Sequence, residues 1–190
     1  MDVLEAIHGR RAVREYLDRQ PSQSVIRSLI GEAVWAPSGV NLQPWCFFVA
    51  DDPAMLAACS AEAKAVMLGQ ADMHPELAHV RERLASPQFN VFYNAPVLVV
   101  ICSITPDEMA LKDCCLAAQT LMLAAHAQGL GSCWIGLAEA WLNTPAGKAR
   151  LGIPAEFRPV APIIVGYPKG SVKATERRAP DIRRVAAGAS

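Results

Sequence analysis

The sequence has no excess of charge of either sign. Its 190 residues include 18 lysines and arginines and 18 aspartates and glutamates, so the formal net charge at pH 7 is +0. This balance gives no bulk attraction to nucleic acid or to an anionic membrane surface. We therefore expect no nucleic acid and no membrane among the partners of this protein.

Signals for export, membrane insertion and metal binding are also missing. The N-terminal stretch MDVLEAIHGRR lacks the apolar core of a signal peptide, and the longest apolar stretch, residues 114–127, is too short to cross a bilayer. The six cysteines form no CxxC motif, and the four histidines have no metal-ligand spacing. We therefore expect reduced thiols, a cytoplasmic protein and no metal site.

The common catalytic motifs are absent as well. The sequence contains no GxSxG, no HExxH and no Walker loop, and its candidate acids and bases are scattered. The glycine-rich stretch GLGSCWIG, residues 129–136, does not match GxGxxG and follows no predicted strand. This pattern favours a protein that binds a reactive cofactor over one that builds a catalytic triad.

Apolar residues, by contrast, are abundant. They make up 52% of the chain, against 19% charged residues, where an average soluble domain has roughly 45–50% apolar residues. The length suits one domain over residues 1–190. Because the apolar surplus must be buried somewhere, it indicates a subunit interface.

The hydrophobic pattern predicts a single α/β domain in which helices and strands alternate. The predicted helices cover residues 2–8, 22–36 (ended by Pro37), 53–69, 75–85 and 107–129, and the predicted strands cover residues 45–50, 95–103 and 160–168. The helix at 107–129 is apolar nearly all round after residue 114, so we expect it to be fully buried. We expect a loop for most of GLGSCWIG, and a tail after residue 168 with no core of its own.

Two segments near the N-terminus have residues suited to ligand binding. RRAVR, residues 10–14, has three arginines, which can grip phosphate, although arginines that follow a helix are usually solvated and complement its dipole. APSGVNLQPW, residues 36–45, combines a fixed backbone with the amides of Asn41 and Gln43. Turn chemistry explains only about half of that composition.

Two later segments are further candidates. GLGSCWIG could point the backbone N–H groups of Ile135 and Gly136 at a ligand, although GLG alone is typical of a helix C-cap. Arg177 and Arg178 lie in the basic tail, which could equally be a plain soluble end.

Taken together and in this order, these segments resemble the FMN-dependent nitroreductase family. The matching stretches are RRAVR, APSGVNLQPW, GLGSCWIG and VGYP (165–168), of which APSxxNxQPW is the most specific. The resemblance covers almost the whole chain. It implies an α/β (α+β) fold with a mixed sheet flanked by helices, in an intertwined homodimer with two FMN sites at the interface.

The resemblance also implies the residues that bind FMN. Arg10 would hold the phosphate and Arg14 would lie near the pyrimidine edge of the ring, while the Gly136 N–H would donate toward N5. The loop of residues 37–41 would reach the same flavin from the other subunit. The full implied set is Arg10, Arg11, Arg14, Pro37, Ser38, Gly39, Asn41, Gln88 (or Asn90), Trp134, Ile135, Gly136, Arg177 and Arg178.

The activity that the resemblance implies is an NAD(P)H-dependent FMN oxidoreductase. It would reduce nitroaromatics, quinones or similar small acceptors by a ping-pong hydride mechanism, with the flavin rather than a side chain carrying the chemistry. Alternatives on the same scaffold are a flavin reductase, a dehalogenase-like or flavin-degrading enzyme, or a flavin-binding protein with little turnover. A dimer without a cofactor would leave the arginines and the QPW loop unexplained. The sequence departs from the family pattern at Ala12, where Ser is frequent, and at Glu176, where a basic residue is common.

Overall fold

The structure of the chain is a computed structural model, which describes residues 1–73 and 78–185. Its centre is a four-stranded sheet with the strand order β1-β2-β4-β3, in which all three neighbouring pairs are antiparallel. The strands are β1 (Trp45–Ala50), β2 (Val97–Ser103), β3 (Gly131–Trp134) and β4 (Arg158–Gly166).

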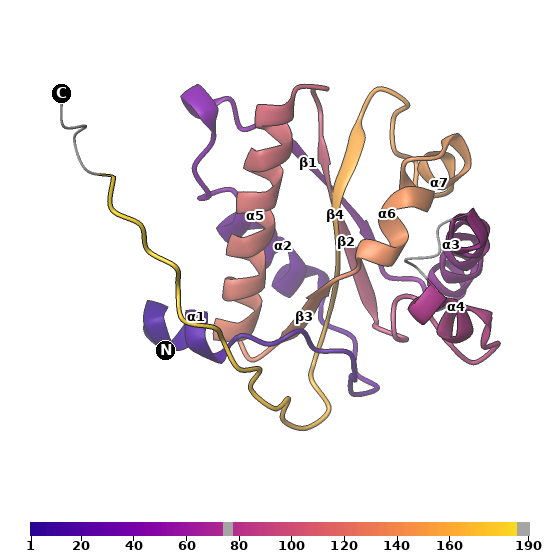
Figure 1. Cartoon of the computed structure of the whole chain (residues 1–190), viewed down its shortest axis with the longest axis horizontal. Coiled ribbons are helices and arrows are strands. Elements are labelled where there is room, and N and C mark those ends of the chain that lie inside the picture. The colour runs from indigo at the N-terminus through magenta and orange to yellow at the C-terminus, as the bar shows by residue number, and fades with distance from the viewer. Residues whose placement is uncertain (74–77, 186–190) are drawn as a thin grey trace.

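Helices cover both faces of this sheet (Figure 1). One layer contains α2 (Gln23–Ala33) and α5 (Glu108–Ala127), with the short α1 (Val3–Gly9) at the end of α5. The other layer contains α3, α4, α6 and α7. Their bounds are Pro53–Met73, Ala78–Ala85, Glu139–Leu142 and Pro145–Arg150, and two 3-10 turns, η1 and η3, cover Gly39–Asn41 and Gly136–Ala138.

The central strand β2 explains why two layers are needed. All seven of its residues are buried. Val97, Val99 and Ile101 pack into the core under α2 and α5, while the alternate residues Leu98 and Val100 belong to the core under α3 and α6. Because successive side chains of a strand point to opposite faces, a continuous apolar run requires a cover on each face. The prediction of a central strand covered on both faces is confirmed.

Most predicted elements are present with shifted ends. The capping box of Asp2 and Glu5 begins α1, and Ser22 caps α2. The helix α2 ends at Ala33, so Pro37 follows a separate turn and is not its direct stop. The helix α3 continues to Met73, beyond its predicted end at residue 69, and the first residues of the helix predicted at 75–85 lie outside the described part of the chain.

The expectation of a loop for most of GLGSCWIG is wrong, because residues 131–134 form β3. This strand pairs with β4 over its whole length, from Gly131 opposite Gly166 to Trp134 opposite Ile163. Four residues with a glycine and a serine give too short and too polar a pattern to show a strand in the sequence.

The segment after α1 lies along the free side of β3. Ala12 forms a parallel bridge with Ser132, and the Val13 N–H donates to the Ser132 carbonyl at 3.0 Å. A Cβ on Gly131 would lie 2.7 Å from the side chain of Val13, so this approach requires glycine. The bridge supplies the parallel component of the mixed sheet, since the named strands pair antiparallel.

The helix α5 is not fully buried within this chain, so that expectation is wrong for the single chain. One face, including Ala117, Leu121 and Ala125, is buried against the sheet. The opposite face leaves Met109 53% exposed and Leu116 45% exposed. No element of the described chain covers that face (Figure 1).

The tail after β4 leaves the body of the molecule, as Figure 1 shows beside α1. Residues 171–185 are all exposed, which agrees with the expected tail without a core. Among the described residues, no helix is long and apolar enough to cross a membrane.

The close approach at Gly131 gives a stability prediction. Gly131→Ala should lower the free energy of unfolding by about 1–3 kcal/mol, because the added methyl group overlaps Val13. The matched control is Gly69→Ala within α3, where nothing lies within 4 Å of the new Cβ, and where we expect a gain of about 0.5–1 kcal/mol. Urea unfolding of both variants measures the difference. Equal stability of Gly131→Ala and the wild type would contradict the packing of residues 12–13 on β3.

Candidate functional site

The structure brings the arginine segment and the GLGSCWIG segment together. The Val13–Ser132 hydrogen bond is followed by two more, Leu17 N–H to the Tyr167 carbonyl at 2.8 Å and Lys169 N–H to the Glu15 carbonyl at 2.9 Å. Residues 12–17 are therefore fastened to the ends of β3 and β4. This arrangement fixes the positions from which the three arginines of RRAVR extend.

A cavity of about 370 Å³ lies beside Arg10 and Arg11. His126 and Ser132 also line it, together with the glycine-containing turn at residues 168–172. Arg11 Nη1 donates to the carbonyls of His8 at 2.6 Å and Arg10 at 2.9 Å, so part of this guanidinium serves as a cap for α1. Its Nε is buried and has no hydrogen-bond partner in the described part of the chain. A buried donor without an acceptor costs free energy.

The charge around this segment is positive and not neutralised. None of the three arginines has a carboxylate within ion-pair distance in the described residues. The positive charge also acts on the neighbouring strand β3. Burial raises the pKa of the Cys133 thiol, and the charges of Arg14 and Arg10 partly offset this rise. Burial also raises the pKa of Tyr16, whose hydroxyl donates to the Val13 carbonyl at 2.7 Å and braces the segment.

The three glycines of GLGSCWIG have different tasks. Gly129 has a φ of +75° and ends α5, as the C-cap interpretation predicts. Gly131 makes room for Val13. Gly136 is exposed, a Cβ there would lie 3.9 Å from the Glu139 carboxylate, and no acceptor for its N–H lies among the described residues.

The expectation that the Ile135 N–H also points at a ligand is wrong. It donates to the Pro162 carbonyl at 2.8 Å, where it prolongs the pairing of β3 with β4. The side chain of Trp134 is fixed by a hydrogen bond, because its indole Nε1 donates to the Glu139 carboxylate at 2.5 Å. This role of Glu139 has no signature in the sequence, because the contact depends on the tight turn at η3.

The APSGVNLQPW loop has a strained backbone. Val40, Asn41 and Gln43 all have positive φ, between 44° and 57°. The Gly39 N–H donates to both oxygens of the buried Asp113 carboxylate, at 3.2 and 3.1 Å, and Ser38 Oγ accepts from the Gln43 N–H at 3.0 Å. These bonds hold the loop against the N-terminal half of α5.

Within one chain, the loop and the arginines are far apart. The loop is bound at Asp113, whereas α1 meets α5 at His126, where a Cβ on Gly9 would overlap the imidazole. Thirteen residues of helix separate these two anchors, which is about 20 Å at 1.5 Å per residue. One chain therefore does not bring Pro37, Ser38, Gly39 and Asn41 to the arginines.

Among the described residues, Gln88, Asn90, Arg177 and Arg178 make no hydrogen bond with the three arginines of RRAVR. Gln88 is exposed and its Oε1 accepts from the Ser86 hydroxyl at 3.1 Å, while Asn90 Oδ1 accepts from the Phe92 N–H at 2.8 Å within a turn. Arg177 and Arg178 lie in the exposed tail. In the described part of the chain, Arg177 makes only long hydrogen bonds of 3.5 Å, to the carbonyls of Thr175 and Glu176.

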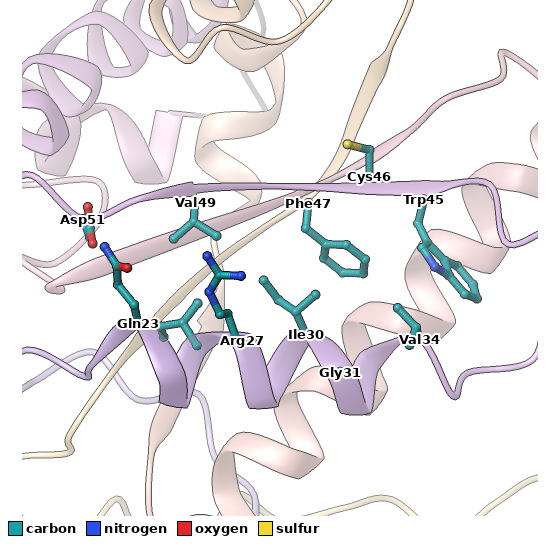
Figure 2. Close-up of a pocket in the computed structure, with 11 residues that line it drawn as sticks. Gln23, Arg27, Ile30, Gly31, Val34, Trp45, Cys46, Phe47, Val49 and Asp51 are labelled. Carbon is teal, nitrogen blue, oxygen red and sulfur yellow. The ribbon is translucent and has the colours of Figure 1, made fainter.

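A larger hollow than the cavity at Arg10 and Arg11 lies between α2 and the edge strand β1 (Figure 2). Its volume is about 810 Å³, and Arg27, Ile30, Phe47 and Val49 point into it, whereas Cys46 points away. None of the predicted site residues lines this groove. We therefore do not take it as the site of chemistry.

Two further residues escaped the sequence analysis. His126 faces Arg10 and Arg11 across the cavity, and Tyr93 lies below the guanidinium of Arg14, with 5.6 Å between the Arg14 Cζ and the ring centroid. The helical spacing of His126 with Met122 and Ala125 marked it only as part of α5. Tyr93 belongs to an irregular turn without a sequence signature.

Comparison with known proteins agrees with this arrangement. The model of the nitroreductase family matches residues 7–167. A protein of Methanothermobacter thermautotrophicus, named as a candidate NADH dehydrogenase/NAD(P)H nitroreductase, is 31% identical over 172 residues, which cover 88% of this chain and 78% of that protein. The 5,6-dimethylbenzimidazole synthase of Rhodospirillum rubrum is 29% identical over 188 residues, covering 88% and 83%.

A solved structure confirms the fold. The nitroreductase of Bacteroides fragilis with bound FMN superposes with a TM-score of 0.85 at 27% identity, over 97% of this chain and 99% of that one. The matched family region contains RRAVR, APSGVNLQPW, GLGSCWIG and most of VGYP, the stretches that carried the resemblance. The chain therefore belongs to the nitroreductase family and is an oxidoreductase.

Proposed function

We propose that this protein is a homodimeric FMN oxidoreductase that uses NAD(P)H to reduce nitroaromatics, quinones or similar small acceptors. The observation that carries the proposal is the pairing of residues 12–13 with Ser132, which sets RRAVR beside the end of β3 and the open Gly136. The FMN bound by the structural relative supports the choice of cofactor.

The residues at this place suit the parts of FMN. The cavity lined by Arg10 and Arg11 fits a phosphate group, which accepts several charge-assisted hydrogen bonds. Arg14 and the Gly136 N–H, which has no acceptor among the described residues, would suit the polar edge of the ring system. Arg177 and Arg178 would add to the phosphate site when the tail is folded back in an assembly.

FMN bound here would supply the redox chemistry, which the proposal takes to be hydride transfer from NAD(P)H to a small acceptor in a ping-pong order. The residues of this chain bind and orient. The Gly136 N–H would donate a hydrogen bond to the ring. The hydrogen bond from the Ile135 N–H to the Pro162 carbonyl already fixes the backbone beside it, so the backbone need not rearrange when the ligand binds. Arg14 would place a positive charge near the bound ring and would stabilise the negative charge gained on reduction.

A dimer would complete the site. The strained loop at residues 37–41 and the arginines lie at opposite ends of α5, so a second copy with α5 antiparallel brings the loop of each chain to the arginines of the other. Apolar side chains are exposed on α1, on α5 and in the segment of residues 35–42. They are Val3 (66%), Leu4 (61%), Trp35 (83%), Val40 (91%), Leu42 (66%), Met109 (53%) and Leu116 (45%).

The tail and the groove of Figure 2 fit the same assembly. The strand β1 pairs only with β2 and leaves its outer edge open. Residues 171–185 are extended and exposed, and they include Val172, Ile182 and Val185 at 44%, 78% and 98% exposure. An open edge beside an apolar groove suits an extended segment of another chain.

The cofactor and the donor are tested together by absorbance. The purified protein, or the protein after addition of FMN, should show a flavin spectrum that bleaches anaerobically with NADH or NADPH and returns with a quinone. Bound flavin that is not turned over would favour the flavin-binding protein instead. A protein that takes up no FMN would contradict the proposed function, and bleaching without return would leave another use of the flavin, such as its degradation.

The dimer is tested on the exposed face of α5. Leu116→Glu should convert a particle of twice the 20.4 kDa chain mass into the monomer and lower FMN affinity at least about tenfold, because a buried unpaired carboxylate opposes association. The control is Ala65→Glu on the exposed side of α3, away from α5, which should remain dimeric. Light scattering with chromatography measures both. A monomeric wild type with full FMN affinity would refute the shared site.

The role of Arg14 is tested by potentiometry. Arg14→Gln should lower the midpoint potential of the bound flavin by about 20–40 mV, since it removes a positive charge near the reduced ring. The reductive half-reaction should slow in parallel. Arg158→Gln, which removes an exposed arginine at the start of β4, should leave the potential unchanged. An unaltered potential in Arg14→Gln would exclude this electrostatic role.

A further inference from the structure

Two arginines from distant parts of the chain meet at Tyr93. Arg83, in the last turn of α4, donates from Nη2 to the Tyr93 hydroxyl at 2.9 Å. Its Cζ lies 5.2 Å from the centroid of the Tyr93 ring and 4.5 Å from that of Phe89. The Cζ of Arg14 lies 5.6 Å from the same Tyr93 ring. We call Arg14, Arg83 and Tyr93 the Tyr93 cluster.

The Tyr93 cluster has positive charge without a counter-charge. Neither arginine has a carboxylate within ion-pair distance in the described part of the chain. Arg83 uses one of its five N–H donors in a hydrogen bond, and Arg14 makes only a long one, 3.5 Å to the Ala12 carbonyl. The Tyr93 hydroxyl accepts from Arg83 and keeps its own proton to donate. Several donors are therefore free at one place.

The backbone under Tyr93 is strained and firmly held. Tyr93 and Asn94 have φ values of +55° and +53°, two consecutive left-handed residues that are not glycine. The turn is closed by Tyr93 N–H to the Asn90 carbonyl at 2.9 Å and by Ala95 N–H to the Phe92 carbonyl at 3.0 Å, with Phe92 and Ala95 buried. Such strain persists only where the surroundings fix it, and it is frequent at ligand sites.

Ordinary surface packing explains this cluster less well. An arginine over an aromatic ring is common and favourable. Two guanidinium groups near one ring, with no carboxylate between them, repel each other instead. Because both arginines retain free donors, an anion shared between them would remove that repulsion.

We propose that the Tyr93 cluster binds an anionic oxygen group, a carboxylate or phosphate, of the molecule that reacts at the cofactor. This inference rests on the proposed function, because Arg14 links the cluster to the ring edge of the flavin. Two sources have this chemistry: a carboxylate on the aromatic acceptor, or the 2′-phosphate that distinguishes NADPH from NADH. Guanidinium groups bind both in the same bidentate manner.

The test compares charged and neutral partners of the holoenzyme. For the acceptor, kcat/KM is measured with 4-nitrobenzoate and with its neutral counterpart 4-nitrobenzamide; for the donor, with NADPH and with NADH. The variants are Arg83→Gln, Arg83→Lys and Tyr93→Phe. Arg81→Gln, two residues earlier on α4, changes the net charge equally and is the control.

For each pair of partners we compare the ratio of kcat/KM with the charged partner to kcat/KM with the neutral one. We expect Arg83→Gln to lower one of these two ratios about tenfold, and Tyr93→Phe to lower the same ratio about threefold. Arg83→Lys should restore part of the loss, and Arg81→Gln should change neither ratio more than about twofold. A fall in the acceptor ratio assigns the anion to the acceptor, and a fall in the donor ratio assigns it to NADPH. If both ratios in Arg83→Gln equal those of the wild type at normal flavin content, the proposal is overturned.

A binding measurement separates this proposal from the proposed function. Calorimetric dissociation constants of 4-nitrobenzoate and of adenosine 2′,5′-bisphosphate require no turnover. Tighter binding to the wild type than to Arg83→Gln, by about tenfold for either probe, supports the anion site even in a protein without activity. Equal binding of both probes to the two proteins argues against it, whatever the flavin spectrum shows.

Discussion

The pairing of residues 12–17 with the ends of β3 and β4 is the interaction on which the rest of the site depends. Three backbone hydrogen bonds of 2.8–3.0 Å join stretches that lie more than a hundred residues apart in the sequence. They form only because Gly131 has no Cβ to meet Val13. Without this contact, the arginines would extend from a free loop, and neither the cavity at Arg11 nor the meeting of Arg14 with Tyr93 would exist.

The length of the helix α5 determines how far apart the two parts of the proposed site lie within one chain. One end holds the strained loop through the Asp113 carboxylate and the other end meets α1 at His126. A rigid helix keeps these two features about 20 Å apart. They can meet only across an interface, and the exposed side of α5 is where apolar surface remains. Shape and hydrophobicity thus favour the same antiparallel partner.

The sequence predicted the features that depend on residues close together in the chain. Asp2 and Glu5 mark a helix start, and the seven buried residues of β2 mark a strand with two covered faces. It did not predict β3, because Gly131 and Ser132 have little strand preference and are held by residues far away. For the same reason it misjudged the Ile135 N–H, whose acceptor is Pro162.

Composition also cannot distinguish burial within a chain from burial between chains, and α5 shows this. Leu116 looks like a core residue in the sequence but is exposed in the single chain.

The arginines of the candidate sites also lower the stability of the free protein, and the fold alone does not explain why they are present. Arg10, Arg11, Arg14 and Arg83 lie without carboxylates in the described chain, and the Arg11 Nε is buried without an acceptor. Each unmet donor or uncompensated charge destabilises the free protein. An anionic ligand reverses these penalties on binding, so the stability lost in the free chain becomes affinity and selectivity. The same logic applies to the phosphate cavity and to the Tyr93 cluster, and it links their arginines to ligands rather than to the core.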